Sequence, residues 1–158
     1  MNKARVGILT TVANFELYEI TSKYFPAGIK RFVIDGRNGM HGIHSIAYMM
    51  PKLKRLNIDW LIMADEDVIF VDSDQVFSVI EKMDKEQLTI AGVRDGGVVI
   101  HRDKSPFAIN TFFSIINLKE VLPIWNKKEV LAHQYINENE FNDDLSDLVG
   151  AFEVKSLY

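Results

Sequence analysis

The stretch Trp60-Leu61-Ile62-Met63-Ala64-Asp65-Glu66-Asp67 decides the fold. Its first five residues are all apolar, which is typical of a central parallel strand covered by helices on both faces. Three acidic residues follow at once, so the chain changes from buried to polar at Asp65. Residues i and i+2 of extended backbone project to the same side, and we therefore expect Asp65 and Asp67 to point the same way.

Apolar segments and helical patterns alternate on both sides of this strand. The predicted strands span residues 6–9, 31–35, 60–64, 88–93 and 108–117. The predicted helices span residues 14–24 and 43–56, with others that begin at Asp72, Asn117 and Asn126. This alternation predicts an α/β fold, a three-layer sandwich with a mostly parallel, Rossmann-like sheet. Right-handed crossovers would place helices on both faces of that sheet.

Composition excludes several classes of protein. A chain of 158 residues with 47% hydrophobic and 25% charged residues is typical of a single soluble domain. The chain has no cysteine, which excludes disulfide scaffolds, thiol nucleophiles and iron–sulfur clusters, and we expect a cytoplasmic location. A net charge of −4 argues against nucleic-acid binding. No apolar run approaches the ~20 residues of a membrane helix, so we expect no membrane segment.

Polar residues follow four of the predicted strands. Ligands of parallel α/β sheets bind at the carboxyl ends of the strands, so we expect these segments to form one site. The segments are Thr10-Thr11, Asp35-Gly36-Arg37, Asp65-Glu66-Asp67 and Arg94-Asp95-Gly96.

The acidic segment predicts metal binding. Two carboxylates held close together repel one another unless a cation lies between them. Oxygen ligands suit Mg²⁺ or Mn²⁺, which usually keep several waters and bind substrate phosphates. Asp65 and Asp67 therefore favour metal-assisted binding of a diphosphate. The alternative is a solvated acidic loop after a strand.

Residues 60–70 resemble the Asp-x-Asp region of nucleotide-diphospho-sugar glycosyltransferases, the GT-A fold. The resemblance extends back through Val33-Ile34-Asp35-Gly36-Arg37 and forward through residues 91–93 and 112–117. It covers about the first 120 residues. It implies an enzyme that transfers a sugar from a nucleotide-diphospho-sugar donor to a hydroxyl acceptor, with Mn²⁺ or Mg²⁺ as cofactor.

The resemblance also implies roles for particular residues. Asp65 and Asp67 would hold the metal and the diphosphate. The donor-binding set would be Thr10, Thr11, Asp35, Gly36 and Asp65, with the two threonines lining the nucleotide pocket and Asp35 at the base or ribose. From the residues alone, Asp35 has a second interpretation. An Asp-Gly pair is common in turns, where the carboxylate accepts local hydrogen bonds.

The two parts of the chain have different predicted roles. Residues 1–117 would bind the donor, within one α/β domain of 158 residues. Residues 118–158 are helical and acidic, and we expect an incomplete acceptor region. Asp143 and Asp144 are candidates for a catalytic base, although an acidic turn is the simpler interpretation. The apolar end of the chain predicts a truncated transferase, or one completed by another copy through a patch near Phe152 and Tyr158.

Two other functions remain open. A non-catalytic donor-binding module would share the whole predicted site. A phosphatase of the haloacid dehalogenase type also places an Asp-x-Asp motif after an apolar strand. That motif normally follows the first strand, whereas here it follows the third, and Val68-Ile69 stands where such enzymes have a threonine.

Overall fold

The computed structural model describes residues 2–37, 39–40, 42–94 and 109–132. The chain divides into two compact units. The first unit comprises residues 1–92 and 111–125 and contains both regions discussed below. In the second unit, helix α5 (Lys127–Ala132) begins after Asn126, whose side-chain oxygen accepts a hydrogen bond from the Lys128 amide.

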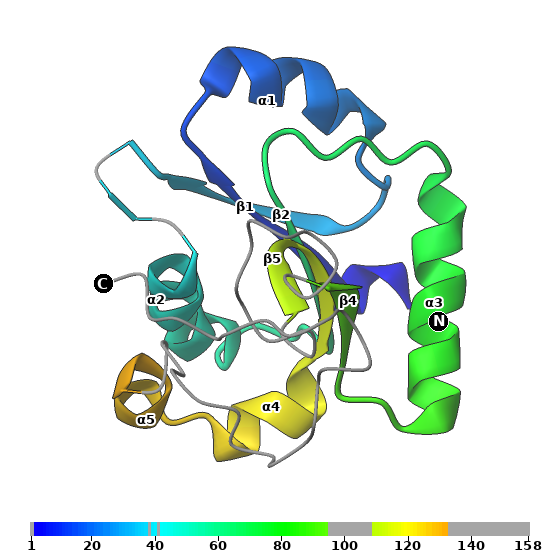
Figure 1. Cartoon of the computed structure of the whole chain (residues 1–158). Coiled ribbons are helices and arrows are strands. Elements are labelled where there is room, and N and C mark those ends of the chain that lie inside the picture. The colour runs from blue at the N-terminus through cyan, green and yellow to red at the C-terminus, as the bar shows by residue number, and fades with distance from the viewer. Residues whose placement is uncertain (1, 38, 41, 95–108, 133–158) are drawn as a thin grey trace, which may run out of the picture. The chain divides into compact units, whose positions relative to one another are not determined.

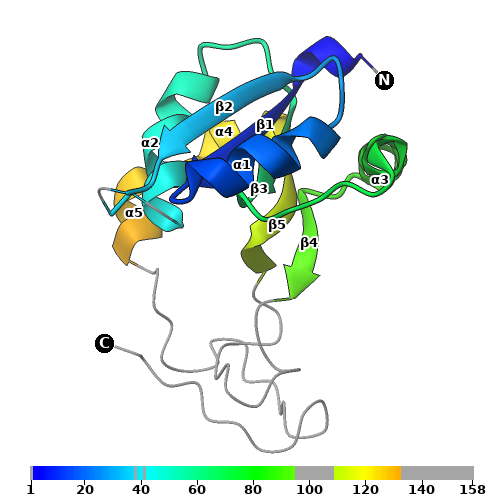
Figure 2. The same cartoon turned by 90° about the horizontal axis from the view of Figure 1, so that it is seen from above.

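The described residues form one five-stranded sheet in the order β2-β1-β3-β5-β4. The strands are β1 (Val6–Val12), β2 (Lys30–Asp35), β3 (Trp60–Ala64), β4 (Ile90–Arg94) and β5 (Ile109–Asn117). All five residues of β3 are buried, as its unbroken apolar sequence predicts. In the view from above, β1 and β2 run side by side (Figure 2).

The sheet is mixed. β1 pairs in parallel with both β2 and β3, but β5 pairs antiparallel with β3. The Asn117 amide at the end of β5 donates to the Thr89 carbonyl just before β4, so β4 and β5 also run in opposite directions. The prediction of a mostly parallel sheet is therefore wrong at the β5 and β4 side of the sheet. The sequence of residues 95–108 has no helical pattern, whereas a parallel pair usually needs a crossover helix between its strands.

Helices cover both faces of the sheet within the first unit. The helices are α1 (Phe15–Thr21), α2 (Ile43–Leu53), α3 (Ser73–Glu86) and α4 (Leu118–Ile124), with 3₁₀ turns at η1 (Lys3–Arg5) and η2 (Ser22–Tyr24). α1 and α3 pack on one face, and α2 and α4 on the other (Figure 1). The predicted three-layer arrangement is confirmed for this unit. None of the helices described is long and apolar enough to cross a membrane.

Local sequence explains where these helices begin and end. The side chains of Asn14, Asp72 and Asn117 each accept a backbone hydrogen bond at the start of α1, α3 and α4. The predicted apolar stripe of α3 is buried. α2 continues through Pro51 and ends at Leu53 rather than near residue 56. The Arg55 and Leu56 amides donate to the carbonyls three residues earlier, as in a tightened last turn.

Candidate functional site

Three of the four predicted segments lie at the same end of the sheet. β1, β2 and β3 are parallel, and the register pairs Val12 with Asp35 and Leu9 with Met63. The residues that follow the ends of these strands therefore lie at one edge. In the fourth segment, Asp95 and Gly96 lie outside the described residues.

Asp65 begins a tight turn. The Val68 amide donates to the Asp65 carbonyl (3.2 Å), which closes a four-residue turn, and the Asp65 amide donates to the Phe112 carbonyl (2.9 Å). The expectation of extended backbone between Asp65 and Asp67 is therefore wrong. An acidic pair beside a strand end favours a turn because Asp side chains hydrogen-bond locally. Asp65 is partly buried in this turn and Asp67 is exposed.

Within the described part of the chain, no ion pair involves the acidic turn. Burial raises the pKa of the Asp65 carboxyl, and the negative charges of Asp67 and Glu66 raise it further. The described residues hold no group of three or more metal-ligating side chains. From the described part of the chain, at most two carboxylates would therefore ligate a cation here. That is the chemistry of Mg²⁺ or Mn²⁺, which take their remaining ligands from water and phosphate.

Asp35 forms a local ion pair. Both oxygens of its carboxylate accept hydrogen bonds from the Arg37 guanidinium (2.9 and 2.6 Å), and one also accepts from the Arg37 amide (3.1 Å). These bonds lower the pKa of Asp35 to about 2. The Arg37 guanidinium also lies 4.7 Å from the centre of the Phe15 ring. The structure thus shows that Asp35 bonds to Arg37 within the turn. A contact between Asp35 and the base of a nucleotide remains a proposal.

The threonines and Gly36 have distinct surroundings. Thr10 is 1% exposed, so it belongs to the core in this structure. Thr11 is partly exposed, and its hydroxyl lies 2.7 Å from the hydroxyl of Ser45 on α2. A Cβ on Gly36 would lie 2.9 Å from the Thr11 methyl and 3.2 Å from the Met40 carbonyl. Glycine at this position therefore lets the loop after β2 pack tightly against the end of β1.

Glu66 connects the acidic turn to the end of β1. One oxygen of its carboxylate accepts hydrogen bonds from the amides of Ala13 (3.3 Å) and Asn14 (3.2 Å). Its backbone carbonyl accepts a hydrogen bond from the hydroxyl of Thr21, a buried residue at the end of α1 (2.6 Å). Sequence reasoning missed both Glu66 and Thr21. They are 45 residues apart, and no local pattern indicates their contact.

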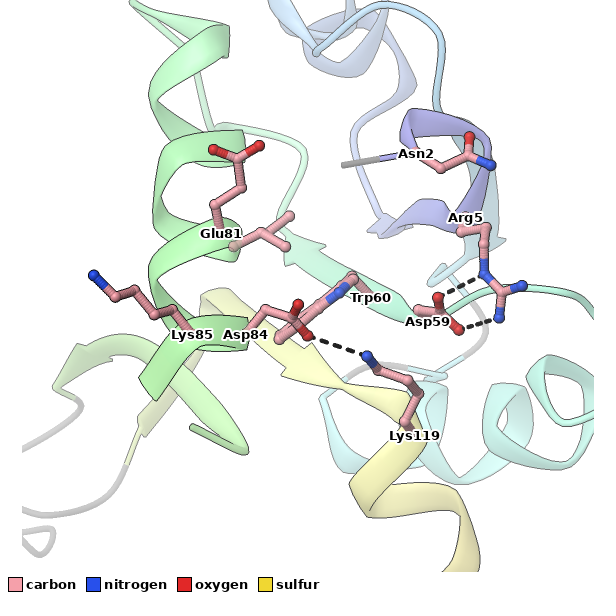
Figure 3. Close-up of a pocket in the computed structure, with 9 residues that line it drawn as sticks. Asn2, Arg5, Asp59, Trp60, Glu81, Asp84, Lys85 and Lys119 are labelled. Atoms are coloured by element: carbon pink, nitrogen blue, oxygen red, sulfur yellow. Dashed lines mark hydrogen bonds and ion pairs between the residues drawn. The ribbon is translucent and has the colours of Figure 1, made fainter. Parts of the chain in front are cut away.

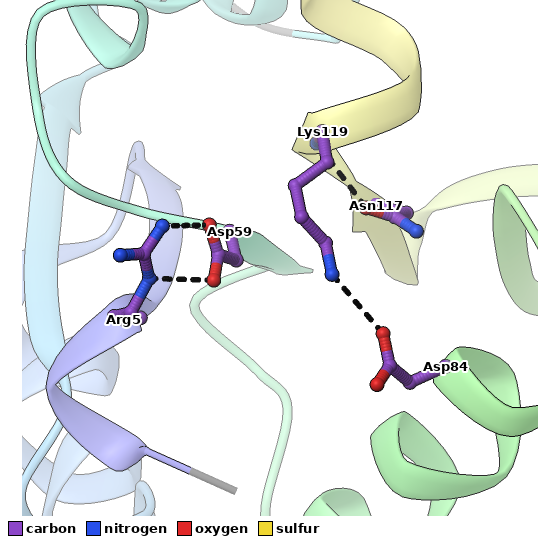
Figure 4. A network of polar contacts seen from close by, with 5 residues as sticks. All are labelled: Arg5, Asp59, Asp84, Asn117 and Lys119. Carbon is purple, nitrogen blue, oxygen red and sulfur yellow. Dashed lines mark hydrogen bonds and ion pairs between the residues drawn. The ribbon is translucent and has the colours of Figure 1, made fainter.

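A cavity of about 310 Å³ lies at the opposite end of the sheet. Its walls come from residues before β1, at the start of β3, after β5 and on α3 (Figure 3). Arg5 binds Asp59 through two hydrogen bonds, and Lys119 binds Asp84 at 3.1 Å (Figure 4). Trp60 lies between these two pairs. The lining is rich in charge, but these four charges neutralise one another.

Comparisons with known proteins give a fold but no family. The chain matches no protein-family model, and no curated protein matches it. A solved structure, A197 from STIV, is similar to this chain with a TM-score of 0.53 and 14% sequence identity. The similarity covers 77% of this chain and 69% of that one. At this identity the likeness concerns the α/β fold alone.

Several predicted features lie outside the described residues. The candidate bases Asp143 and Asp144 and the tail with Phe152 and Tyr158 belong to residues 133–158. The catalytic base and the self-association patch therefore stay predictions.

Proposed function

We propose that the protein is a metal-dependent glycosyltransferase of the GT-A type that binds a nucleotide-diphospho-sugar at the carboxyl ends of β1, β2 and β3. The observation that carries this proposal is the acidic turn. Asp65 and Asp67 follow a fully buried strand, and burial raises the pKa of Asp65, as do the negative charges of Asp67 and Glu66. Among the described residues, no cationic side chain forms an ion pair with either aspartate. A divalent cation with a diphosphate would balance that charge.

The neighbouring residues fit a donor site around this turn. Asp65 and Asp67 would hold Mn²⁺ or Mg²⁺, which supplies positive charge to the leaving diphosphate. Thr11, with exposed surface at the end of β1, would line the nucleotide pocket with Gly36 beside it. Asp35 would accept a hydrogen bond from the base or ribose, which requires Arg37 to give up part of its contact with that carboxylate. The sugar would pass to a hydroxyl acceptor.

Calorimetric titration with a panel of nucleoside diphosphates, with and without Mn²⁺, tests the proposal. We expect Mn²⁺-dependent binding with a preference for one base. Binding of inorganic phosphate or phosphoesters without base preference would indicate a phosphatase instead. The absence of nucleotide binding under all conditions would refute the donor site.

A transfer assay separates an enzyme from a donor-binding module. The matching nucleotide-sugar is incubated with Mn²⁺ and a panel of saccharide acceptors, and the released nucleoside diphosphate is measured. Release that depends on an acceptor supports the transferase. Tight donor binding without release for any acceptor would make the protein a binding module.

A further inference from the structure

The acidic turn is held in place by a residue that does not itself need to bind the metal. Glu66 lies between Asp65 and Asp67, yet its side chain bonds to the amides of Ala13 and Asn14 at 3.3 and 3.2 Å. Three acidic side chains in succession repel one another, and this repulsion favours an open loop. Two amides that bond one carboxylate oxygen oppose that opening.

A second contact fixes the backbone at the same residue. The Thr21 hydroxyl lies 2.6 Å from the Glu66 carbonyl, closer than the carbonyls of Leu17 (3.1 Å) and Tyr18 (3.4 Å). A hydroxyl has one proton to donate, so the short distance indicates that Glu66 receives it. Thr21 is 1% exposed, and its side chain is therefore fixed by packing. Glu66 is thus tied to both ends of the segment from Ala13 to Thr21.

We propose that Glu66 and Thr21 are positioning residues, which hold the turn so that Asp65 and Asp67 are ready to bind a divalent cation. This inference rests on the proposed function. A metal ligand pair that is already ordered loses less conformational entropy on binding. Residues that orient metal ligands typically change metal affinity by about 10–100-fold when they are removed.

Four variants distinguish a positioning role of Glu66 and Thr21 from a simple effect of the negative charge of Glu66. Glu66→Ala removes both the acceptor and the charge, whereas Glu66→Gln removes the charge and keeps an acceptor oxygen. Thr21→Val removes the hydroxyl without changing any charge, and Thr21→Ser keeps the hydroxyl. Glu19→Ala, at an exposed carboxylate on α1, is the control for net charge.

Two measurements are made on each variant. Affinity for Mn²⁺ alone is followed by the electron paramagnetic resonance signal of the free ion. Amide hydrogen exchange at Ala13 and Asn14 is measured without metal. We expect Glu66→Ala to weaken Mn²⁺ binding by about 10–100-fold and Thr21→Val by several-fold. Glu66→Gln, Thr21→Ser and Glu19→Ala should stay within a few-fold of the natural protein. Exchange at both amides should accelerate in Glu66→Ala.

The outcomes distinguish this inference from the proposed function. Equal losses in Glu66→Gln and Glu66→Ala, with Thr21→Val unchanged, would make Glu66 a ligand or a source of charge and overturn positioning. Unchanged amide exchange in Glu66→Ala would show that the contacts to Ala13 and Asn14 do not hold the loop, and would also overturn it. If the natural protein binds no Mn²⁺, the proposed function fails and the positioning role fails with it. Faster exchange in Glu66→Ala would then still show that Glu66 fastens the loop.

Discussion

The two ends of β3 both have acidic residues nearby, but these residues have different partners at the two ends. Before the strand, Asp59 is bonded by Arg5, and the nearby Lys119 is bonded by Asp84. After the strand, burial raises the pKa of Asp65, and the negative charges of Asp67 and Glu66 raise it further. Both ends are therefore polar, but Asp59 and Asp84 at the first end have cationic partners, whereas Asp65 at the second has the acidic neighbours Glu66 and Asp67.

This difference shows why a hollow alone does not identify a functional site. The cavity of about 310 Å³ lies at the end where Arg5 and Lys119 are already paired with Asp59 and Asp84. At the other end, Asp65 has no cationic partner among the described residues, and a ligand with a metal would supply positive charge there. Under the proposed function, charge balance rather than cavity volume would mark the site. The predictions below test that distinction.

Removing either carboxylate of the acidic turn should have the largest effect. We expect Asp65→Asn and Asp67→Asn each to abolish Mn²⁺-dependent nucleoside diphosphate binding, because each removes one of two protein ligands. Without metal, Asp65→Asn should be slightly more stable than the natural protein, because like-charge repulsion is relieved. Asp84→Asn, at the other end of the sheet, is the matched control. Equal calorimetric affinity in the control and the two turn variants would refute the metal site.

Replacing Asp35 should weaken nucleotide binding to a smaller degree. We expect Asp35→Ala to reduce nucleoside diphosphate affinity by about tenfold, the typical effect of one lost hydrogen bond to a charged group. Its affinity for Mn²⁺ alone should stay unchanged. If the variant instead binds nucleotide normally and melts at a lower temperature, Asp35 serves only the turn with Arg37.

Breaking an ion pair at the opposite end should change stability and not binding. We expect Arg5→Ala to lower the denaturant midpoint, because Asp59 is partly buried and loses both guanidinium hydrogen bonds. Nucleoside diphosphate affinity should equal that of the natural protein. A loss of affinity without loss of stability would move the functional site toward this end.

The ion pair of Asp35 predicts a dependence on pH. Arg37 lowers the pKa of Asp35 to about 2, below its unfolded value of about 3.9, so ionised Asp35 favours the folded state. That contribution is complete above pH 4 and is lost as the pH falls toward 2. Arg37→Gln should return the pKa of Asp35 toward 3.9 in a carboxyl-carbon NMR titration. An unchanged pKa would mean that Arg37 is not the cause.

The sequence predicted best the elements with a clear pattern of apolar residues, which are β3 and α3. β3 was predicted to the residue because a run of five apolar residues is too short for a typical helix and fits a strand that is buried on both faces. The stripe on α3 was equally clear, since Val76, Phe77, Ile80 and Met83 are spaced for one helical face. The direction of β5 was missed because β composition does not specify the pairing partner.

Sequence reasoning placed three of the four selected segments at one edge of the sheet but missed the contacts among them. Chain order and strand ends were enough to bring Thr11, Asp35 and Asp65 to one edge of the sheet. The bond between Glu66 and Thr21 was not predictable, because it depends on how the loop after β3 packs against α1. Thr10 was misjudged for a related reason. A polar residue next to a strand end can still be buried when the strand extends further, and β1 continues to Val12.

Paramagnetic broadening by Mn²⁺ tests the central claim most directly, because it reports on both ends of β3 in one experiment. Backbone amide signals are recorded while Mn²⁺ is added with the preferred nucleoside diphosphate. The account predicts that the amides of residues 65–68 and of Phe112 broaden first, while those of Asp59, Asp84 and Lys119 remain sharp. Broadening that begins at Asp59 and Asp84, or that affects neither end, would contradict it.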